Sequence, residues 1–149
     1  MLLKKVQESE CGELLQFIRD IAEYEKLSHE VVATVDILRN SLFGATPRAQ
    51  AFFIQPEDER IGFAVLYFSF STFSGRPQLY IEDIFISPEH RAKGYGSKVW
   101  EEIEALARSE GCSAMHWNVL DWNQPAINFY LKIGAKPMSD WTMYRKRLA

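Results

Sequence analysis

The stretch of residues 84–97 constrains the fold most, because a strand pattern there enters a helix pattern through two glycines. Residues 84–86 end a β-rich run, and Pro88 stops it since proline donates no hydrogen bond to a sheet. From residue 95 to 109 apolar side chains recur at helical spacing, until Gly111 ends the pattern. Glycines at such a junction let an anion approach the unpaired N–H groups of the helix start. The junction therefore suits a diphosphate.

Three interpretations of these glycines compete. A nucleotide P-loop requires a Lys-Ser/Thr pair after its glycine, whereas here Lys93 precedes Gly94. A dinucleotide-binding Rossmann turn requires a glycine or alanine three residues beyond Gly96, and Val99 occupies that position. The third interpretation is a surface turn that caps the helix, with Arg91 and Lys93 as solvated charges. The pattern alone does not separate this turn from an anion site, so the surrounding sequence must decide.

The size and composition of the chain favour one globular domain. Its 149 residues have the length of a single domain, and 47% hydrophobic residues can bury a full core, so we expect one domain over residues 1–149. The net charge of -3 gives no reason to expect a nucleic-acid or membrane partner. The absence of a long apolar run or a signal peptide predicts a cytoplasmic protein. The two cysteines and three histidines lack metal-ligand spacing, which predicts no metal.

The patterns along the chain predict the element order β-α-α-β-β-β-α-β-α-β. The expected strands are residues 2–7, 49–54, 61–71, 78–86, 112–120 and 141–148. The expected helices are residues 10–24, about 34–42, 95–109 and 125–134. This order fits neither a purely parallel nor an all-β fold. It predicts a mixed α/β (α+β) fold with helices on both faces of one mixed sheet.

The sequence resembles a known family in four segments that occur in the family's order. Arg91-x-x-Gly94-x-Gly96 after the Ile/Phe/Ile strand is similar to the acyl-CoA motif of the GNAT superfamily of N-acetyltransferases. Residues 79–84, 121–124 and 128–130 resemble its diamine (spermidine/spermine) and thialysine acetyltransferase branch, and residues 24–28 and 119–124 are closest to the thialysine type. Two positions depart from the branch. Ala92 stands where relatives often have glycine, and the stretch 137–141 is shorter, which weakens the case for a polyamine substrate.

The chemistry of amine acetylation requires a base and an acid. An alkyl amine has a pKa of about 10.4, so it arrives protonated and a base must remove its proton. The resemblance implies that Glu82 is this base, acting through a water molecule. The resemblance also implies Tyr130 as the acid that protonates the departing CoA thiolate. In a regular strand Asp83 faces away from Glu82, so both serve one pocket only if the strand is bulged. A solvated carboxylate at Glu82, a packed ring at Tyr130 and a surface ion pair at Asp83 remain open alternatives.

The resemblance implies two further sets of site residues. The main chain near Phe85 would hold the pantetheine arm and the oxyanion, and the glycine turn would hold the diphosphate. The expected acetyl-CoA set is Ile84, Phe85, Ile86, Arg91, Ala92, Lys93, Gly94, Tyr95, Gly96, Ser97, Asn123, Ala126 and Tyr130. The expected amine set is Lys26, Leu27, Glu82, Asp83, His116, Trp117 and Asn118.

The sequence thus predicts an acetyl-CoA-dependent N-acetyltransferase with the GNAT fold, in which a mostly antiparallel central sheet splays after its fourth strand. The expected acceptor is the primary amine of a small cationic molecule, such as a diamine, a polyamine or a lysine-like amino acid. Direct attack in a ternary complex is expected, and the branch implies a homodimer. Two alternatives stay open: an acetyltransferase that acts on protein lysines or N-termini, and an acyl-CoA-binding sensor without turnover.

Overall fold

A computed structural model describes all 149 residues, which form two compact units, residues 1–118 and 119–149. The first unit contains one five-stranded sheet with the strand order β1-β2-β3-β4-β5. The strands are β1 (Leu3–Lys5), β2 (Gln50–Ile54), β3 (Gly62–Ser71), β4 (Arg76–Ile86) and β5 (Met115–His116). The first four strands pair antiparallel, whereas β5 runs parallel to β4. The mixed, mostly antiparallel sheet that the sequence predicted is confirmed.

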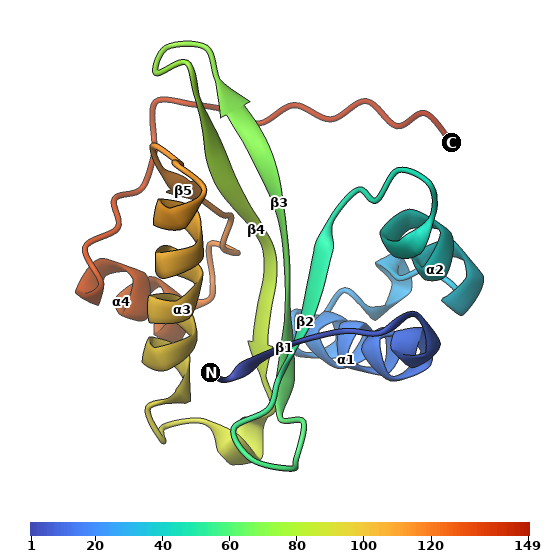
Figure 1. The fold of residues 1–149 in the computed structure, drawn as a ribbon. Helices are drawn as coiled ribbons and strands as arrows, with labels where there is room; N and C mark the ends of the chain where they lie inside the picture. The colour runs from blue at the N-terminus through green and yellow to red at the C-terminus, as the bar shows by residue number, and fades with distance from the viewer. The chain divides into compact units, whose positions relative to one another are not determined.

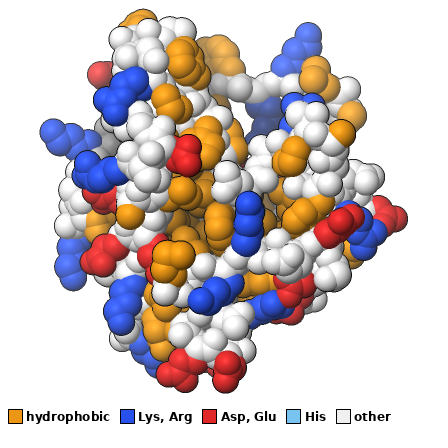
Figure 2. Space-filling model, in the orientation of Figure 1, with side chains coloured by type: hydrophobic (Ala, Val, Ile, Leu, Met, Phe, Trp, Pro, Cys, Tyr) orange, Lys and Arg blue, Asp and Glu red, His pale blue; other side chains and the backbone are white.

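Helices cover both faces of this sheet (Figure 1). α1 (Cys11–Tyr24) and α2 (Val35–Phe43) lie on one face, and α3 (Tyr95–Ser109) lies on the other. Three short 3-10 turns, η1 (Glu8–Glu10), η2 (Ser28–Glu30) and η3 (Pro88–His90), connect these elements. None of the helices combines the length and the hydrophobicity that crossing a bilayer requires. Basic and acidic side chains are interspersed on the face that Figure 2 shows, in keeping with the nearly balanced charge of the chain.

The core beneath α1 and α2 is built from aromatic rings. Leu14 of α1 packs in a buried cluster with strand residues that include Phe53, Phe63 and Phe85. The centre of the Phe17 ring lies 6.1 Å from the centre of the Phe53 ring and 6.2 Å from that of the Phe63 ring. Burying an apolar side chain of this size stabilises the fold by about 2 kcal/mol. This cluster therefore fixes α1 against the second half of β4, where the candidate site begins.

The pairing of β3 with β4 changes register within the ladder. Val65 lies opposite Asp83, but the next residue of β3, Leu66, lies opposite Ile81, so Glu82 has no partner. One extra residue in a strand is a β-bulge, and it reverses the faces that the following side chains occupy. Because Val65 packs with the core under α1, its partner Asp83 faces that side, whereas Ile81 faces the α3 side. The bulge is the condition under which Glu82 and Asp83 can serve one pocket.

Two of the expected strands are wrong in whole or in part. The expected strand 112–120 contains only β5, because the chain pairs with β4 at two positions and then leaves it. The expected strand 141–148 is absent, since those residues pair with no strand. The other expected elements are present, with ends shifted by a few residues. Thr34 caps α2 as its position suggests, accepting a hydrogen bond from the Ile37 N–H at 3.2 Å.

The second unit contains one helix, α4 (Gln124–Lys132), and the irregular segment that follows it. Asn123 precedes the helix, and its side-chain oxygen accepts a hydrogen bond from the Ala126 N–H at 3.4 Å. Pro125 lies in the first turn, where its missing N–H costs nothing, and Gly134 follows the helix with a φ of 89°. The helix that the sequence predicted over residues 125–134 is therefore confirmed.

Gly62 provides a test of the β3–β4 pairing. A Cβ at this position would lie 1.9 Å from the main-chain oxygen of Phe85, so Gly62→Ala must push the end of β4 away from β3. We expect this variant to lose about 3 kcal/mol of unfolding free energy in a denaturant titration followed by circular dichroism. Gly12→Ala is the matched control, because a Cβ on Gly12 meets no atom within 4 Å. Equal stability of the two variants would contradict the close approach of the strands.

Candidate active site

The second half of β4 has an open edge. β5 pairs with β4 only at Leu79 and Tyr80, so residues 84–86 have no strand on that side. The Ser87 N–H donates to the Ile61 oxygen at 2.8 Å, which shows that the main chain of Ser87 faces β3. Alternation along the strand then turns the main chain of Phe85 toward β3 as well. The main-chain groups that face the open edge are those of residues 84 and 86.

The glycine turn forms the start of α3 without a side-chain cap. Ala92 and Gly94 have φ angles of 61° and 82°, in the left-handed region that favours glycine. Gly94 occupies the cap position, where it has no side chain to accept a hydrogen bond from the first turn. The first turn also contains no acidic residue. This helix start therefore keeps the positive end of its dipole for an anion from outside.

The side chain of Arg91 connects the turn to two other elements. Its Nε donates to the Ile86 oxygen at 2.7 Å, which fixes the turn to the end of β4. Its guanidinium lies 4.6 Å from the centre of the Tyr24 ring and 5.3 Å from that of Phe85. A guanidinium over an aromatic face is attracted by the electrons of the ring. Arg91 thus joins the turn to the end of α1, whereas Lys93 is exposed.

Carboxylates concentrate around the bulge of β4. Burial, together with the negative charges of Glu82 and Glu25, raises the pKa of Asp83 to about 7. Burial also raises the pKa of Glu25, at the end of α1. Such carboxyl groups hold a proton more readily than solvated ones, and a cation placed among them would reverse the shift. The site is therefore prepared for a positively charged ligand.

Two tyrosines border the carboxylates. Tyr67 and Tyr80 lie opposite each other on β3 and β4, with ring centres 5.0 Å apart. Burial raises the pKa of both phenols, and the charge of Glu82 adds to the effect. Asn118 donates from its side-chain nitrogen to the Tyr80 hydroxyl at 2.8 Å. The chain after β5 is thereby held beside Tyr80, two residues before the bulge.

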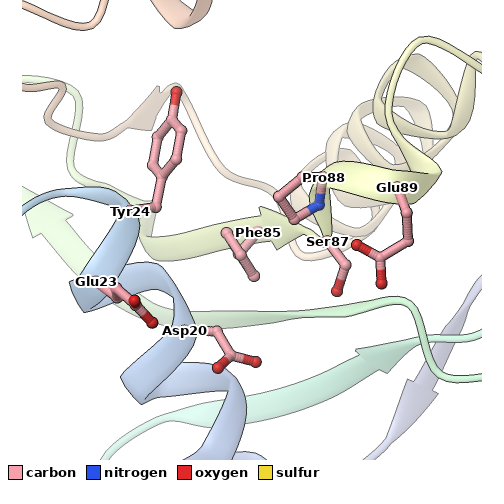
Figure 3. A pocket seen from close by; sticks show the side chains of 7 residues that line it. All are labelled: Asp20, Glu23, Tyr24, Phe85, Ser87, Pro88 and Glu89. Atoms are coloured by element: carbon pink, nitrogen blue, oxygen red, sulfur yellow. The ribbon is translucent and has the colours of Figure 1, made fainter.

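A cavity of about 380 Å³ opens between α1 and the segment that follows β4 (Figure 3). Figure 3 shows the side chains of α1 on one side of this space and those of residues 87–89 on the other. The lining residues are Asp20, Glu23, Tyr24, Phe85, Ser87, Pro88 and Glu89. Three of them are carboxylates and two are aromatic, a combination that suits a cationic group with an apolar stem.

The expected site residues divide between the two units. In the first unit, the bulge, the open edge and the glycine turn follow one another along the chain between Glu82 and Ser97. Lys26 follows α1 with a φ of 62°, and Trp117 packs its ring 4.5 Å from that of Trp100. In the second unit, the ring of Tyr130 meets that of Phe129 edge-on at 6.0 Å. The catalytic role of Tyr130 and the cofactor contacts of Asn123 and Ala126 remain predictions.

Sequence reasoning missed three carboxylates near the end of α1, which we call the acidic wall. Asp20, Glu23 and Glu25 were not among the expected site residues, although all three lie toward the end of the first amphipathic helix. Asp20 and Glu23 are three residues apart, a spacing that places two side chains on one helical face. That spacing was the only sequence signal for a shared acidic surface. It was weak evidence for a binding site, because charged residues at such positions are usually solvated.

Comparison with known proteins identifies the family. Residues 13–135 match the Acetyltransferase (GNAT) family, and the chain belongs to it. It is therefore an acetyl-CoA-dependent N-acetyltransferase, as the sequence predicted.

Individual relatives agree with this assignment. The thialysine N-epsilon-acetyltransferase of Bos taurus is 35% identical over 156 residues, which cover 97% of this chain and 91% of that protein. An L-ornithine N5-acetyltransferase of Arabidopsis thaliana is 26% identical over 175 residues, covering 87% of this chain and 77% of that protein. The structure of an integron cassette protein from V. cholerae superposes with a TM-score of 0.79 at 23% identity, covering 97% of this chain and 91% of that one, and shows the shared fold.

The left-handed conformation of Ala92 gives a test of the glycine turn. A side chain costs about 1 kcal/mol in this conformation, so Ala92→Gly should raise the unfolding free energy by about that amount. Ala105→Gly makes the same chemical change at an exposed position inside α3 and should lower it by about 1 kcal/mol. Thermal and urea unfolding of both variants measure the difference. Changes of the same sign would contradict the turn geometry.

Proposed function

We propose that the acceptor is a free amino acid or small diamine with a side-chain ammonium group, of the thialysine, lysine or ornithine type. The observation that carries this proposal is the group of carboxylates at the β4 bulge, where the negative charges of Glu82 and Glu25 act on Asp83. An ammonium relieves their repulsion, whereas a neutral or acidic acceptor does not. The names of the relatives support the same class, since thialysine and ornithine each carry a side-chain amine.

In the proposed ternary complex, the cofactor lies along the open edge with its diphosphate at the start of α3. Main-chain groups of residues 84 and 86 would hold the pantetheine arm, and the N–H groups of residues 95–97 would hold the diphosphate. Lys93, exposed beside the turn, adds positive charge there. The amine would enter from the acidic side, along the wall that α1 and the residues after β4 form. Holding both substrates in one geometry makes the attack effectively unimolecular.

The proposed reaction moves two protons. The ammonium gives one proton to the carboxylate pair Glu82 and Asp83, which frees the lone pair of its nitrogen. That nitrogen attacks the carbonyl carbon of the acetyl thioester, and a tetrahedral oxyanion forms. When it collapses, the carbon–sulfur bond breaks, Tyr130 protonates the leaving thiolate, and the nitrogen loses its second proton, which restores the Tyr130 hydroxyl. The products are an N-acetyl amide and free CoA, and the chemistry uses only groups of the protein and its substrates.

The assembly and location of the enzyme are part of the same proposal. The family match includes residues from both compact units, which supports one catalytic domain over residues 1–149. Its resemblance to the diamine and thialysine branch supports a homodimer, and the expected location is the cytoplasm.

A panel of acceptors tests the proposal. The amines are thialysine, lysine, ornithine, spermidine and putrescine, and the controls are norleucine, which lacks the side-chain amine, and a peptide with a free N-terminus. We expect CoA release, followed with a thiol reagent, to be fastest for the amino acids with a side-chain amine. Activity on the peptide alone would favour a protein acetyltransferase. CoA binding without activity on any acceptor would favour a sensor.

Tyr130 tests the acid step separately. Tyr130→Phe removes one hydroxyl, and we expect kcat to fall more than tenfold while the Kd of CoA, measured by calorimetry, stays within about threefold. Tyr144→Phe is the matched control, because Tyr144 is 91% exposed and lies in the C-terminal segment. Full activity of Tyr130→Phe would remove this residue from the mechanism.

A further inference from the structure

The open edge of β4 begins where β5 stops pairing. β5 pairs with β4 at Leu79 and Tyr80. If this parallel ladder continued, the next residue of the chain, Trp117, would lie opposite Ile81. Trp117 and Val119 are of types that favour strands, and each further pair would satisfy main-chain groups of both segments. Because the local sequence does not explain the end of the ladder, contacts of the side chains at this point must account for it.

Trp117 packs against a second indole, on α3. The centres of the Trp117 and Trp100 rings lie 4.5 Å apart, and the ring planes make an angle of 60°. Trp100 is buried on α3 together with Val99, Ile103 and Ala107, so its position on the helix is fixed by the core. Aromatic rings at this distance attract each other in addition to the gain from burying their surface. We call the pair Trp100 and Trp117 the indole wedge.

The indole wedge lies on the face of the sheet that α3 covers. Ile81 faces the same side and is buried, with 3% of its surface exposed. In a continued ladder, Ile81 and both indoles would have to share the layer between β4 and α3. Protein interiors are close-packed, and an indole added beside a buried isoleucine would overfill this layer. The size of the wedge therefore gives a physical reason for the chain to leave β4 at Trp117.

The next residue, Asn118, holds the chain from the other face of the sheet. Its side-chain nitrogen donates to the Tyr80 hydroxyl at 2.8 Å. Tyr80 precedes Ile81 in β4, so its side chain faces away from α3. In a continued ladder Asn118 would lie opposite Glu82, two residues further along β4 than Tyr80. Trp117 and Asn118 thus fix the chain on both faces at the point where it leaves β4.

We propose that the indole wedge keeps the second half of β4 unpaired, and that Trp117 is a positioning residue for acetyl-CoA. This inference rests on the proposed function, in which the pantetheine arm lies along the main chain of residues 84–86. A chain that continued the ladder would occupy the same main-chain groups. Trp100 belongs to the helix that begins at the turn proposed for the diphosphate, so α3 contributes to both parts of the cofactor path. The resemblance implied that Trp117 contacts the amine, whereas the wedge gives it a role toward the cofactor.

Trp117→Val tests the inference, because valine is smaller than tryptophan and favours strands. In this variant the chain after β5 should pair with β4 most of the time. If the edge is open for about a tenth of the time, the Kd of CoA rises about tenfold, since only the open form binds. Calorimetry measures this Kd. Steady-state kinetics should show a similar rise in the KM of acetyl-CoA, whereas kcat and the KM of the amine stay within about twofold.

Hydrogen exchange distinguishes a closed edge from a damaged core. A variant that only loses packing exchanges its amides faster, because local unfolding becomes easier. A closed edge has the opposite effect, so the main-chain N–H groups of residues 82–86 should exchange more slowly in Trp117→Val than in the wild type, measured by mass spectrometry without cofactor. Trp117→Phe keeps a ring beside Trp100 and should show smaller changes of the same sign, also if Trp117→Val does not fold. Trp141→Val is the matched control, because Trp141 is 72% exposed.

The inference is wrong if the Trp117 variants bind CoA as tightly as the wild type. Weaker binding together with faster exchange of residues 82–86 would reduce the wedge to ordinary packing. An equal loss of CoA affinity in Trp141→Val would show that position 117 has no specific role. A wild type without affinity for CoA would overturn the proposed function itself, and with it the role of the wedge.

Discussion

The pairing of β3 with β4 determines where everything else in the first unit lies. The two strands approach each other closely at Gly62. Within the ladder, β4 has one more residue than β3. That single residue, Glu82, changes which side chains face α1. In a regular ladder without the bulge, Asp83 and Ile81 would share a face, whereas here they face opposite sides. The chemistry of the site therefore depends on a backbone irregularity more than on any individual side chain.

The start of α3 has no side-chain cap, which suits the proposed cofactor site. Side chains cap two other helices, Thr34 at α2 and Asn123 at α4, whereas α1 and α3 have no side-chain cap. At α3 the corresponding position is Gly94, and the preceding turn keeps an alanine in a left-handed conformation. A protein that leaves a helix start uncapped and also accepts backbone strain beside it gains a place for an anion. In a GNAT enzyme the anion is the diphosphate of acetyl-CoA.

The sequence predicted local elements well and long-range pairing poorly. The caps at Thr34 and Asn123 and the apolar period of residues 95–109 depend on neighbours in the chain, and the helices they predicted are present. The expected strand 112–120 had a suitable composition, but a strand exists only where a partner is available, and β4 offers one at two positions. The register shift at Glu82 likewise depends on the partner strand β3. The acidic wall of α1 became visible only when Glu25 and Asp83 were brought together by the fold.

Arg91 has a consequence for how the two substrates influence each other. Its side chain contacts an oxygen of β4 and the ring of Tyr24, while its main chain begins the turn that is proposed to receive the diphosphate. Tyr24 in turn lines the cavity on the amine side. Arg91 thus connects the proposed cofactor turn to a residue that lines the cavity. With this connection we expect ordered binding, in which the cofactor precedes the amine.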